Sequence, residues 1–522
     1  MTAILESRYL LVWPLAASIL LPIIYFLLNE LERYRARVKG LKGPRGLPVV
    51  GNLRQLHGIS ASEQYRLWAQ KYGPVFQVQL GNVPIVIVNS AAAAKNLFLT
   101  QTSALNSRPV FHVFHKIVSK NVLSIGTSPW DDSCKRRRKA AATALNRSKT
   151  ESYLPILNLE VTEFIRNLYE EGKGGAFAID PTEITHRLSL NLSLTLNYGF
   201  RADSTKALQS SPLLQEVIHI ETEIGKLRSV GMNYSNYIPA LRILDSIKET
   251  LRISPGPAYG RDIGRRRLKY NKVLLEKLKQ RIEEGTDNPC IQGGVLKDPE
   301  ASSLTEEELI SISLSMMAGA ETTTPTIGWG ILLLAHRPDI QALAYNSILT
   351  SGIDPSDPLA PGTPQIDYIM AFTKEIMRYY TPLRLALPKS TSTDALWEGT
   401  VIPKDTMVFL NSWSCNRDPI PFPNPNTFLP ERWLEKNPPS HYTFGYGGRM
   451  CVASHVANQG LYMAFLHLVA TYELLPDGET DLDVIDPLLG IEDVRATRAG
   501  PKGVRVKFAP RRKKGRLEKF GA

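Results

Sequence analysis

The chain has 522 residues, 43% of them hydrophobic and 8% aromatic, so it can bury a large core and is not a disordered polypeptide. Its 62 Lys and Arg residues against 50 Asp and Glu residues give a net charge of +12. Because these basic residues are scattered and accompany no nucleic-acid motif, we expect an anionic membrane surface and an acidic protein partner, and no nucleic acid. The four cysteines form no CxxC pair, which favours a reducing compartment over a disulfide framework.

The N-terminal segment Tyr9–Leu28 contains no charged residue and, at twenty residues, is long enough to cross a bilayer as a helix. More basic residues follow this segment than precede it, so the positive-inside rule places the rest of the chain in the cytosol. A cleaved signal peptide is the alternative, but the apolar run is long and Glu6 lies before it. We therefore predict a membrane anchor over residues 1–30.

A basic hinge rich in proline and glycine is predicted over residues 31–52, ending in Gly43-Pro-Arg-Gly-Leu-Pro-Val-Val-Gly-Asn52. After it, Val75–Leu80 and Ile85–Val88 flank Gly81-Asn82, a pattern that predicts a β-hairpin. Beyond the hairpin the apolar spacing is mostly helical. We therefore expect a mainly α fold with a small β portion.

Trp130 precedes the basic run Asp131–Lys139, which we expect to form a helix. This run is either a solvated basic face or a patch for an acidic partner. A basic amphipathic helix is predicted around Arg265–Arg281. Linkers rich in Gly, Asp and Pro are predicted from Gly285 to Ser303 and from Ser351 to Gln365.

Thr305 to Glu308 has the pattern of a helix capping box, and an apolar run leads from it to Ala318-Gly-Ala-Glu-Thr-Thr323. Charge inside an apolar helix is costly, so a buried Glu321 needs a function. Gly319, the threonine hydroxyls and Pro325 each favour a distortion of the helix here. Taken alone, the stretch also fits a kinked core helix with incidental threonines.

Two further segments carry paired charges. Glu375 and Arg378 are three residues apart, so they lie on one face of a helix, where such pairs are usually solvated. Downstream, Phe428-Leu-Pro-Glu-Arg-Trp433 follows in a region rich in proline.

Near the C-terminus, Phe444-Gly-Tyr-Gly-Gly-Arg-Met-Cys-Val-Ala453 holds one cysteine in a glycine-rich loop before the apolar run Val456–Leu468. A thiol at the start of a helix lies in the positive end of the helix dipole, so we expect a lowered pKa and a good metal ligand. The alternative is a free core cysteine at an ordinary junction of loop and helix.

Together these segments resemble the haem-binding and core motifs of the cytochrome P-450 superfamily: Phe-x-x-Gly-x-Arg-x-Cys, Ala/Gly-Gly-x-Asp/Glu-Thr-Thr, Glu-x-x-Arg and Phe-x-Pro-Glu-Arg-Phe/Trp. Two positions depart from the pattern. Ala453 replaces the usual glycine, which we expect to alter helix packing more than ligation. Cys134 stands four residues after Trp130, where the family has arginine, so Lys135 or Arg137 is expected to substitute.

The resemblance implies a cytochrome P-450 fold, a haem b held by Cys451 as the iron ligand, and oxygen activation by a Cys thiolate. It implies that Arg449, Phe444, Trp130 and Lys389 also bind the haem. It further implies that Glu321 and Thr322 handle protons, and that Glu375, Arg378 and Arg432 form a buried structural cluster. The haem domain is expected over residues 53–510, with a basic tail over 511–522.

Between about Pro44 and Pro510, segments such as Leu105-Asn-Ser-Arg-Pro-Val-Phe111 and Asn288-Pro-Cys-Ile-Gln-Gly293 look like the fungal phenylacetate and 3-hydroxyphenylacetate hydroxylases. That resemblance implies ring hydroxylation of an arylacetic acid by a single-pass protein of the endoplasmic reticulum membrane. Arg384 is the candidate to pair with the substrate carboxylate; binding a haem propionate or facing solvent are its alternatives.

The sequence contains no P-loop and no dinucleotide fingerprint, so the partners expected are O2, a small aromatic substrate and a separate NADPH-dependent flavoprotein reductase. One alternative is a monooxygenase of fungal secondary metabolism that acts on a polyketide or another aromatic intermediate. A non-catalytic haem-binding membrane protein and an isomerase that needs no reductase are two more. Glu321 and Thr322 favour an enzyme, because a binder needs no pair for proton delivery.

Overall fold

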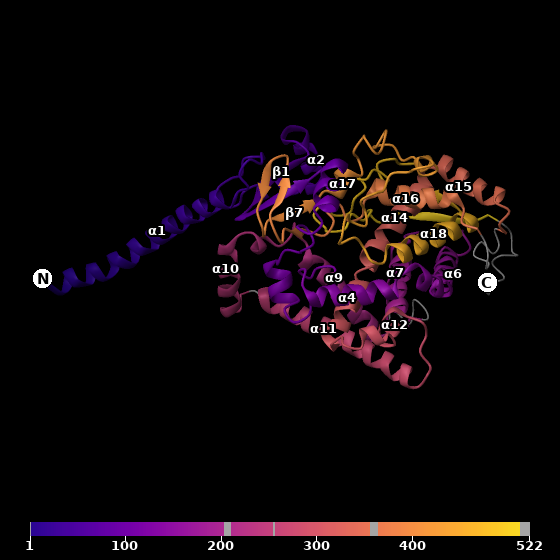
Figure 1. Cartoon of the computed structure of the whole chain (residues 1–522), viewed down its shortest axis with the longest axis horizontal. Coiled ribbons are helices and arrows are strands. Elements are labelled where there is room, and N and C mark those ends of the chain that lie inside the picture. Colours follow the sequence, from indigo (N-terminus) through magenta and orange to yellow (C-terminus); the bar gives the residue numbers. More distant parts are fainter. Residues whose placement is uncertain (1, 203–209, 254–255, 355–363, 512–522) are drawn as a thin grey trace.

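The computed structural model describes residues 2–202, 210–253, 256–354 and 364–511. The basic tail predicted from residue 511 onward therefore lies outside the described residues except for Arg511. The described chain is mainly helical, with its largest sheet at the end of the body where α1 attaches and another strand pair beside α14 and α18 (Figure 1). The predicted mainly α fold with a small β portion is confirmed.

The helices are α1 (Thr2–Ala36), α2 (Ala61–Tyr72), α3 (Ala91–Ala94), α4 (Asp132–Ala144), α5 (Arg147–Ser152), α6 (Leu154–Glu171), α7 (Thr182–Tyr198), α9 (Pro212–Arg228), α10 (Pro239–Thr250), α11 (Gly256–Glu283), α12 (Ile291–Leu296), α13 (Glu306–Met317), α14 (Ala320–His336), α15 (Pro338–Thr350), α16 (Asp367–Tyr380), α17 (Ser412–Cys415) and α18 (Ser454–Thr471). The strands are β1 (Val75–Leu80), β2 (Val83–Val88), β3 (Ala178–Ile179), β4 (Lys389–Ser390), β5 (Ala395–Trp397), β6 (Thr400–Ile402), β7 (Met407–Leu410), β8 (Tyr472–Pro476) and β9 (Val506–Pro510).

The largest sheet has the order β1-β2-β7-β4, with β2 and β7 parallel and the other neighbours antiparallel. Its first two strands form the predicted hairpin, in which Leu80 pairs with Val83. The sheet brings Lys389 on β4 into the same layer as the hairpin, although some 300 residues separate them in sequence. Smaller sheets have the orders β3-β9-β8 and β5-β6.

The main core lies where α6, α7, α14, α16 and α18 pack together. Trp329 on α14 stacks on Tyr380 of α16 with ring centroids 4.2 Å apart, and both side chains are fully buried. Apolar side chains surround α18 on nearly every face, as expected of a helix that runs through a core. The rigid α14–α16–α18 unit positions the loops that precede α14 and α18.

The N-terminal helix α1 projects from the body (Figure 1). Among the residues whose side chains are described, no helix combines the length and apolar content that a bilayer crossing requires. The membrane anchor over residues 1–30 stays a prediction. Contacts with the body begin near the end of α1: Asn82 donates to Asn29, and Arg33 donates to the Gly81 carbonyl.

Two linker predictions have different outcomes. The stretch from Gly285 to Ser303 is not a plain linker, because it contains α12, capped by the Cys290 sulfur, which accepts a hydrogen bond from the Gly293 N–H. Most of the second predicted linker, Ser351 to Gln365, lies outside the described residues. The predicted basic helix at 265–281 lies within α11, and the Thr305–Glu308 capping box begins α13.

Candidate active site

The Cys451 loop is built from backbone hydrogen bonds that aim the cysteine into a cavity. Cys451 N–H donates to the Phe444 carbonyl at 3.0 Å, and Met450 N–H donates to Gly447 at 3.0 Å. Gly447 has φ +77°, and a Cβ there would lie 1.9 Å from the carbonyl oxygen of Phe98. Only glycine therefore fits this close approach of the loop to its neighbour.

Ala453, which departs from the family pattern, is the N-cap residue of α18 with φ −94° and ψ 13°. An L-residue adopts these angles without strain, so the backbone does not require glycine here. The extra methyl group packs against the main core. The geometry gives a physical reason for the tolerance of alanine at this position.

The accessible surface of Cys451 lines an internal cavity, so the thiol faces enclosed space within the fold. Loss of surrounding water raises the pKa of its thiol, while the Ala453 N–H and the charge of Arg138 lower it. The sequence-based expectation of a lowered pKa is therefore wrong: desolvation outweighs the helix N-terminus. A coordinated metal ion nevertheless removes the proton of a thiol ligand.

The predicted proton-handling residues lie beside a break between α13 and α14. The break falls at Ala318 and Gly319, and Pro325 lies inside α14 without breaking it. The hydroxyls of Thr322 and Thr323 both donate to the Gly319 carbonyl, at 3.2 and 3.1 Å. Glu321 forms an ion pair with Arg228, the last residue of α9.

One cavity holds both groups. It is lined by Cys451, Phe444, Glu321 and Thr322, among others. Apolar side chains such as Met316, Leu383 and Leu461 lie beside these groups, and an apolar lining with a few polar groups is typical of cofactor and ligand sites. We call it the inner cavity.

Besides Arg228 and Arg498, four cations line the inner cavity: Arg108, Arg138, Lys389 and Arg449. None of them forms a salt bridge with another described residue. Burial, followed by repulsion from neighbouring arginines, lowers the pKa of Lys389 well below its usual range, and burial lowers that of Arg449 to about 10. Uncompensated charge of this kind calls for an anionic ligand.

Two of these arginines have a donor without a partner. The buried Nε atoms of Arg108 and Arg449 have no hydrogen-bond partner among the described residues. A haem carries two anionic propionates. The Cys451 thiol lies here in one cavity with Arg108, Arg138, Lys389 and Arg449, four cations that we call the cationic wall. These residues therefore fit a haem.

Of the other predicted haem contacts, Arg449 and Lys389 line the inner cavity, and Trp130 contacts Arg449. Arg449 donates to the Asn106, Ile125 and Ser128 carbonyls, and its guanidinium lies 5.2 Å from the centre of the Trp130 ring. Lys389 donates to the Tyr446 carbonyl at 2.7 Å. Trp130 thus supports Arg449 just before α4 begins.

Neither expected substitute for the missing family arginine, Lys135 or Arg137, is among the described residues that line the inner cavity. Lys135 is exposed and pairs with Asp132, while Arg137 is buried and donates to the Leu123 carbonyl and the Ser128 hydroxyl. The residue of α4 that lines the inner cavity is Arg138, which donates to the Met450 carbonyl at 2.7 Å. It lies one helical turn after Cys134, so the i, i+4 spacing within α4 was the signal that sequence reasoning missed.

Glu375, Arg378 and Arg432 meet in the core. Arg378 donates to both Glu375 oxygens at 2.7 and 2.8 Å, and Arg432 donates at 3.3 Å. Trp433 and the Leu429 N–H complete the shell around the Glu375 carboxylate. The remaining guanidinium donors of Arg378 bind the carbonyls of Asn416, Pro425 and Thr427.

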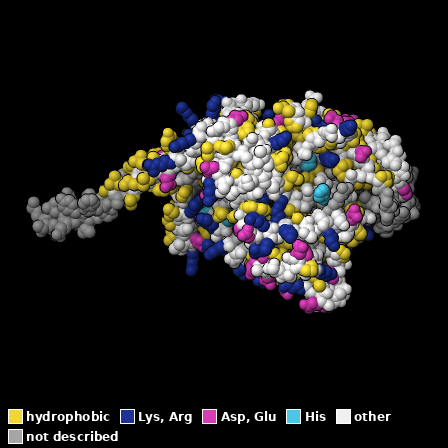
Figure 2. All heavy atoms as spheres, in the orientation of Figure 1, with side chains coloured by type: hydrophobic (Ala, Val, Ile, Leu, Met, Phe, Trp, Pro, Cys, Tyr) yellow, Lys and Arg dark blue, Asp and Glu magenta, His cyan; other side chains and the backbone are white. Residues whose placement is uncertain are grey.

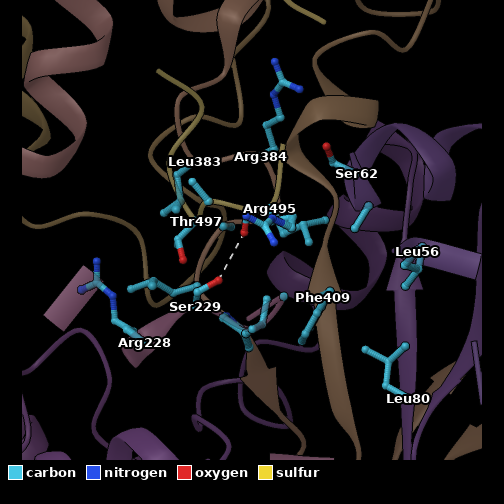
Figure 3. A pocket seen from close by; sticks show the side chains of 18 of the residues that line it. Leu56, Ser62, Leu80, Arg228, Ser229, Leu383, Arg384, Phe409, Arg495 and Thr497 are labelled. Carbon is cyan, nitrogen blue, oxygen red and sulfur yellow. Dashed lines mark hydrogen bonds between the residues drawn. The ribbon is translucent and has the colours of Figure 1, made fainter. Parts of the chain in front are cut away.

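Arg384 lines a second cavity, the outer cavity (Figure 3). Its guanidinium donates to the Pro487 carbonyl and lies 4.1 Å from the Trp413 ring centre. Burial lowers its pKa to about 9. The inner and outer cavities share eight lining residues, including Arg108, Arg228 and Leu387, so they adjoin one another.

The cytochrome P450 family model matches residues 41–494. This chain is a member of the cytochrome P450 family. It is 44% identical to 3-hydroxyphenylacetate 6-hydroxylase of Emericella nidulans, over 95% of this chain and 94% of that protein. It is 39% identical to phenylacetate 2-hydroxylase of the same organism, over 94% of each chain, and 37% identical to a P450 monooxygenase of Mycosarcoma maydis, over 90% of this chain and 87% of that one.

This P450 is therefore a haem-thiolate monooxygenase that uses O2, a substrate and a redox partner. The cysteine of the family motif is Cys451, and the structure places it in the same cavity as Thr322 and the cationic wall.

Proposed function

We propose that this P450 hydroxylates the aromatic ring of an arylacetic acid. Two similar proteins are named for hydroxylating 3-hydroxyphenylacetate and phenylacetate. In this chain the proposal is carried by the inner cavity, where Cys451 and Thr322 share an apolar space with arginine side chains. Apolar walls suit a ring, and a guanidinium suits a carboxylate.

When bound, the haem supplies the reductive activation of dioxygen. The chain's own part is to hold the propionates, exclude water and move protons. Arg108, Arg138, Lys389 and Arg449 would hold the propionates. Thr322 would pass the proton of its hydroxyl, which the Gly319 carbonyl now orients, to the oxygen being activated. The Glu321 carboxylate next to it would take up a proton from water and return it to the Thr322 oxygen.

The proposal is tested with purified haem-loaded protein, reductase, NADPH and ¹⁸O2. We expect phenylacetate or 3-hydroxyphenylacetate to gain one labelled oxygen on the ring, detected by mass spectrometry. Turnover of polyketide phenols with no turnover of any arylacetic acid would instead favour the secondary-metabolite alternative.

Thr322→Ala should divert reducing equivalents from product to hydrogen peroxide, because the proton relay loses its hydroxyl. General acid catalysis of this kind contributes roughly 10²–10⁴-fold, so the yield of product per NADPH should fall steeply. The measurement compares NADPH consumed, product and peroxide. Thr324→Ala is the matched control, since Thr324 lies on the same helix, donates to Ala320 and does not line the described inner cavity. Unchanged coupling in Thr322→Ala would remove Thr322 from the mechanism.

We infer that the N-terminal segment anchors this P450 in the endoplasmic reticulum membrane with its catalytic domain in the cytosol, where an NADPH-dependent flavoprotein reductase supplies electrons. The uncharged run in the sequence supports the anchor. Basic side chains also gather where α1 meets the body (Figure 2). Arg35, Arg37 and Lys39 are exposed there and suit an anionic headgroup surface.

Deleting residues 2–28 should move the protein from the membrane fraction toward the soluble fraction while leaving haem content unchanged. The deletion stops before Asn29 and Arg33, which contact the body. Residual association from the basic residues should disappear at high salt. Loss of haem binding in the shortened protein would show that the removed segment is part of the fold.

A further inference from the structure

Arg228 lies where the inner and outer cavities adjoin. It is the last residue of α9, and it lines both the inner cavity of Cys451 and the outer cavity seen in Figure 3. Only 15% of its side chain is accessible. A ligand that extends from one cavity into the other therefore lies against this guanidinium.

The position beside Arg228 already accommodates a carboxylate, that of Glu321 on α14. The pairing is incomplete, because Arg228 Nε and Glu321 Oε1 are both buried without a hydrogen-bond partner among the described residues. A guanidinium offers five donors in a planar fork. Arg228 therefore retains a donor for a second anion, and the enclosed site makes such a bond strong.

Other cations near the cavities are engaged in other ways. Arg108 donates to the Leu387 and Pro388 carbonyls and belongs to the wall that fits the haem propionates. Arg384 lies on a different side of the outer cavity from Arg228 and is held by Pro487 and Trp413 (Figure 3). Arg495 is exposed and pairs with Asp493. Of these four arginines, Arg228 combines three properties: it is largely buried, it lines both cavities and it already pairs with a carboxylate.

We propose that Arg228 binds the carboxylate of the arylacetic acid, with Glu321 as its counter-ion before substrate arrives. The inference rests on the proposed function. The ring then lies among apolar side chains of the inner cavity, such as Met316, Leu383 and Leu387. A buried carboxylate must be paired, and an arginine pairs it with directional hydrogen bonds.

A substrate-binding role for Arg228 predicts a result that a purely structural role would not. Glu321 and the substrate carboxylate carry like charges and share one guanidinium, so the charge of Glu321 opposes substrate binding. Removing the charge of Arg228 and removing that of Glu321 should therefore shift the affinity for an acid in opposite directions. Neither change should affect a neutral ligand of the same shape in this way.

The test measures equilibrium binding to the haem-loaded protein by calorimetry, with phenylacetate and its neutral analogue 2-phenylethanol. In Arg228→Leu, phenylacetate should bind about 100-fold or more weakly, the scale of a broken buried ion pair, with little change for the alcohol. Arg228→Lys should recover part of the loss because it restores the charge. Glu321→Gln should bind phenylacetate more tightly than the unmutated protein.

Arg384→Leu is the matched control, and haem content and melting temperature show that each variant folds. Equal losses of acid and alcohol in Arg228→Leu, or a selective loss of the acid in Arg384→Leu alone, would overturn the assignment to Arg228. An unmutated protein that binds no arylacetic acid overturns the proposed function itself. Binding that is normal in the unmutated protein and unaffected in Arg228→Leu overturns this inference alone.

Discussion

Cys451→Ser should abolish the long-wavelength carbon monoxide band of the reduced protein. That band requires a thiolate on the iron, and a serine hydroxyl is a far weaker donor of electron density. Among the four cysteines, Cys451 lines the inner cavity, whereas Cys134, Cys290 and Cys415 are buried elsewhere. The loop itself should survive, because its hydrogen bonds are made by the backbone.

The matched control is Cys290→Ser. The Cys290 sulfur caps α12, and a serine oxygen accepts the same kind of hydrogen bond from the Gly293 N–H. This variant should keep both the band and full haem content. Retention of the band in Cys451→Ser, or its loss in Cys290→Ser, would contradict the assignment of the ligand.

Local geometry explains why the Cys451 loop was predictable from sequence. Gly447 packs so closely on the Phe98 carbonyl that the structure restricts which residue can stand there. The hairpin and the capping box were predictable for the same reason, since each is specified by residues a few positions apart.

The cationic wall was only partly predictable, because chain segments far apart in sequence build it. Arg449 reaches the Asn106 carbonyl across 343 positions, and Arg108 reaches Leu387 across 279. The ion pair between Arg228 and Glu321 spans 93 positions and joins α9 to α14. No short sequence motif predicts that these two helices pack together. The family resemblance implied haem contacts for Arg449 and Lys389 but implied no role for Arg108 or Arg228.

Two errors also have physical causes. The thiol pKa was expected to fall because only the helix dipole was considered, whereas burial dominates in the folded protein. The linker from Gly285 to Ser303 has a composition typical of loops, yet Ile291 and Gln292 are buried and Gln292 donates to the Leu309 carbonyl. Tertiary contacts stabilise α12 despite its weak intrinsic preference for helix.

Glu375→Gln should destabilise the protein by about 3–5 kcal/mol, the usual cost of breaking a buried ion pair by removing one partner. The Glu375 and Arg378 side chains are inaccessible to solvent, and Arg432 is 5% accessible. The amide keeps the shape of the carboxylate but leaves two buried guanidinium charges without a counter-ion. It also replaces one acceptor oxygen by a donor that faces other donors, since Arg378, Arg432, Trp433 and the Leu429 N–H all donate to Glu375.

The measurement is the urea midpoint of unfolding, followed by circular dichroism, together with the rate of haem loss. Haem should be lost faster, because Asn416 receives a hydrogen bond from Arg378 and its own side chain binds the Tyr442 N–H at the start of the Cys451 loop. Glu300→Gln is the control: its pair with Lys139 is 74% accessible on both sides, and exposed pairs contribute little. Equal midpoints for Glu375→Gln and Glu300→Gln would show that the buried cluster does not stabilise the fold, and would leave its link to the Cys451 loop without energetic support.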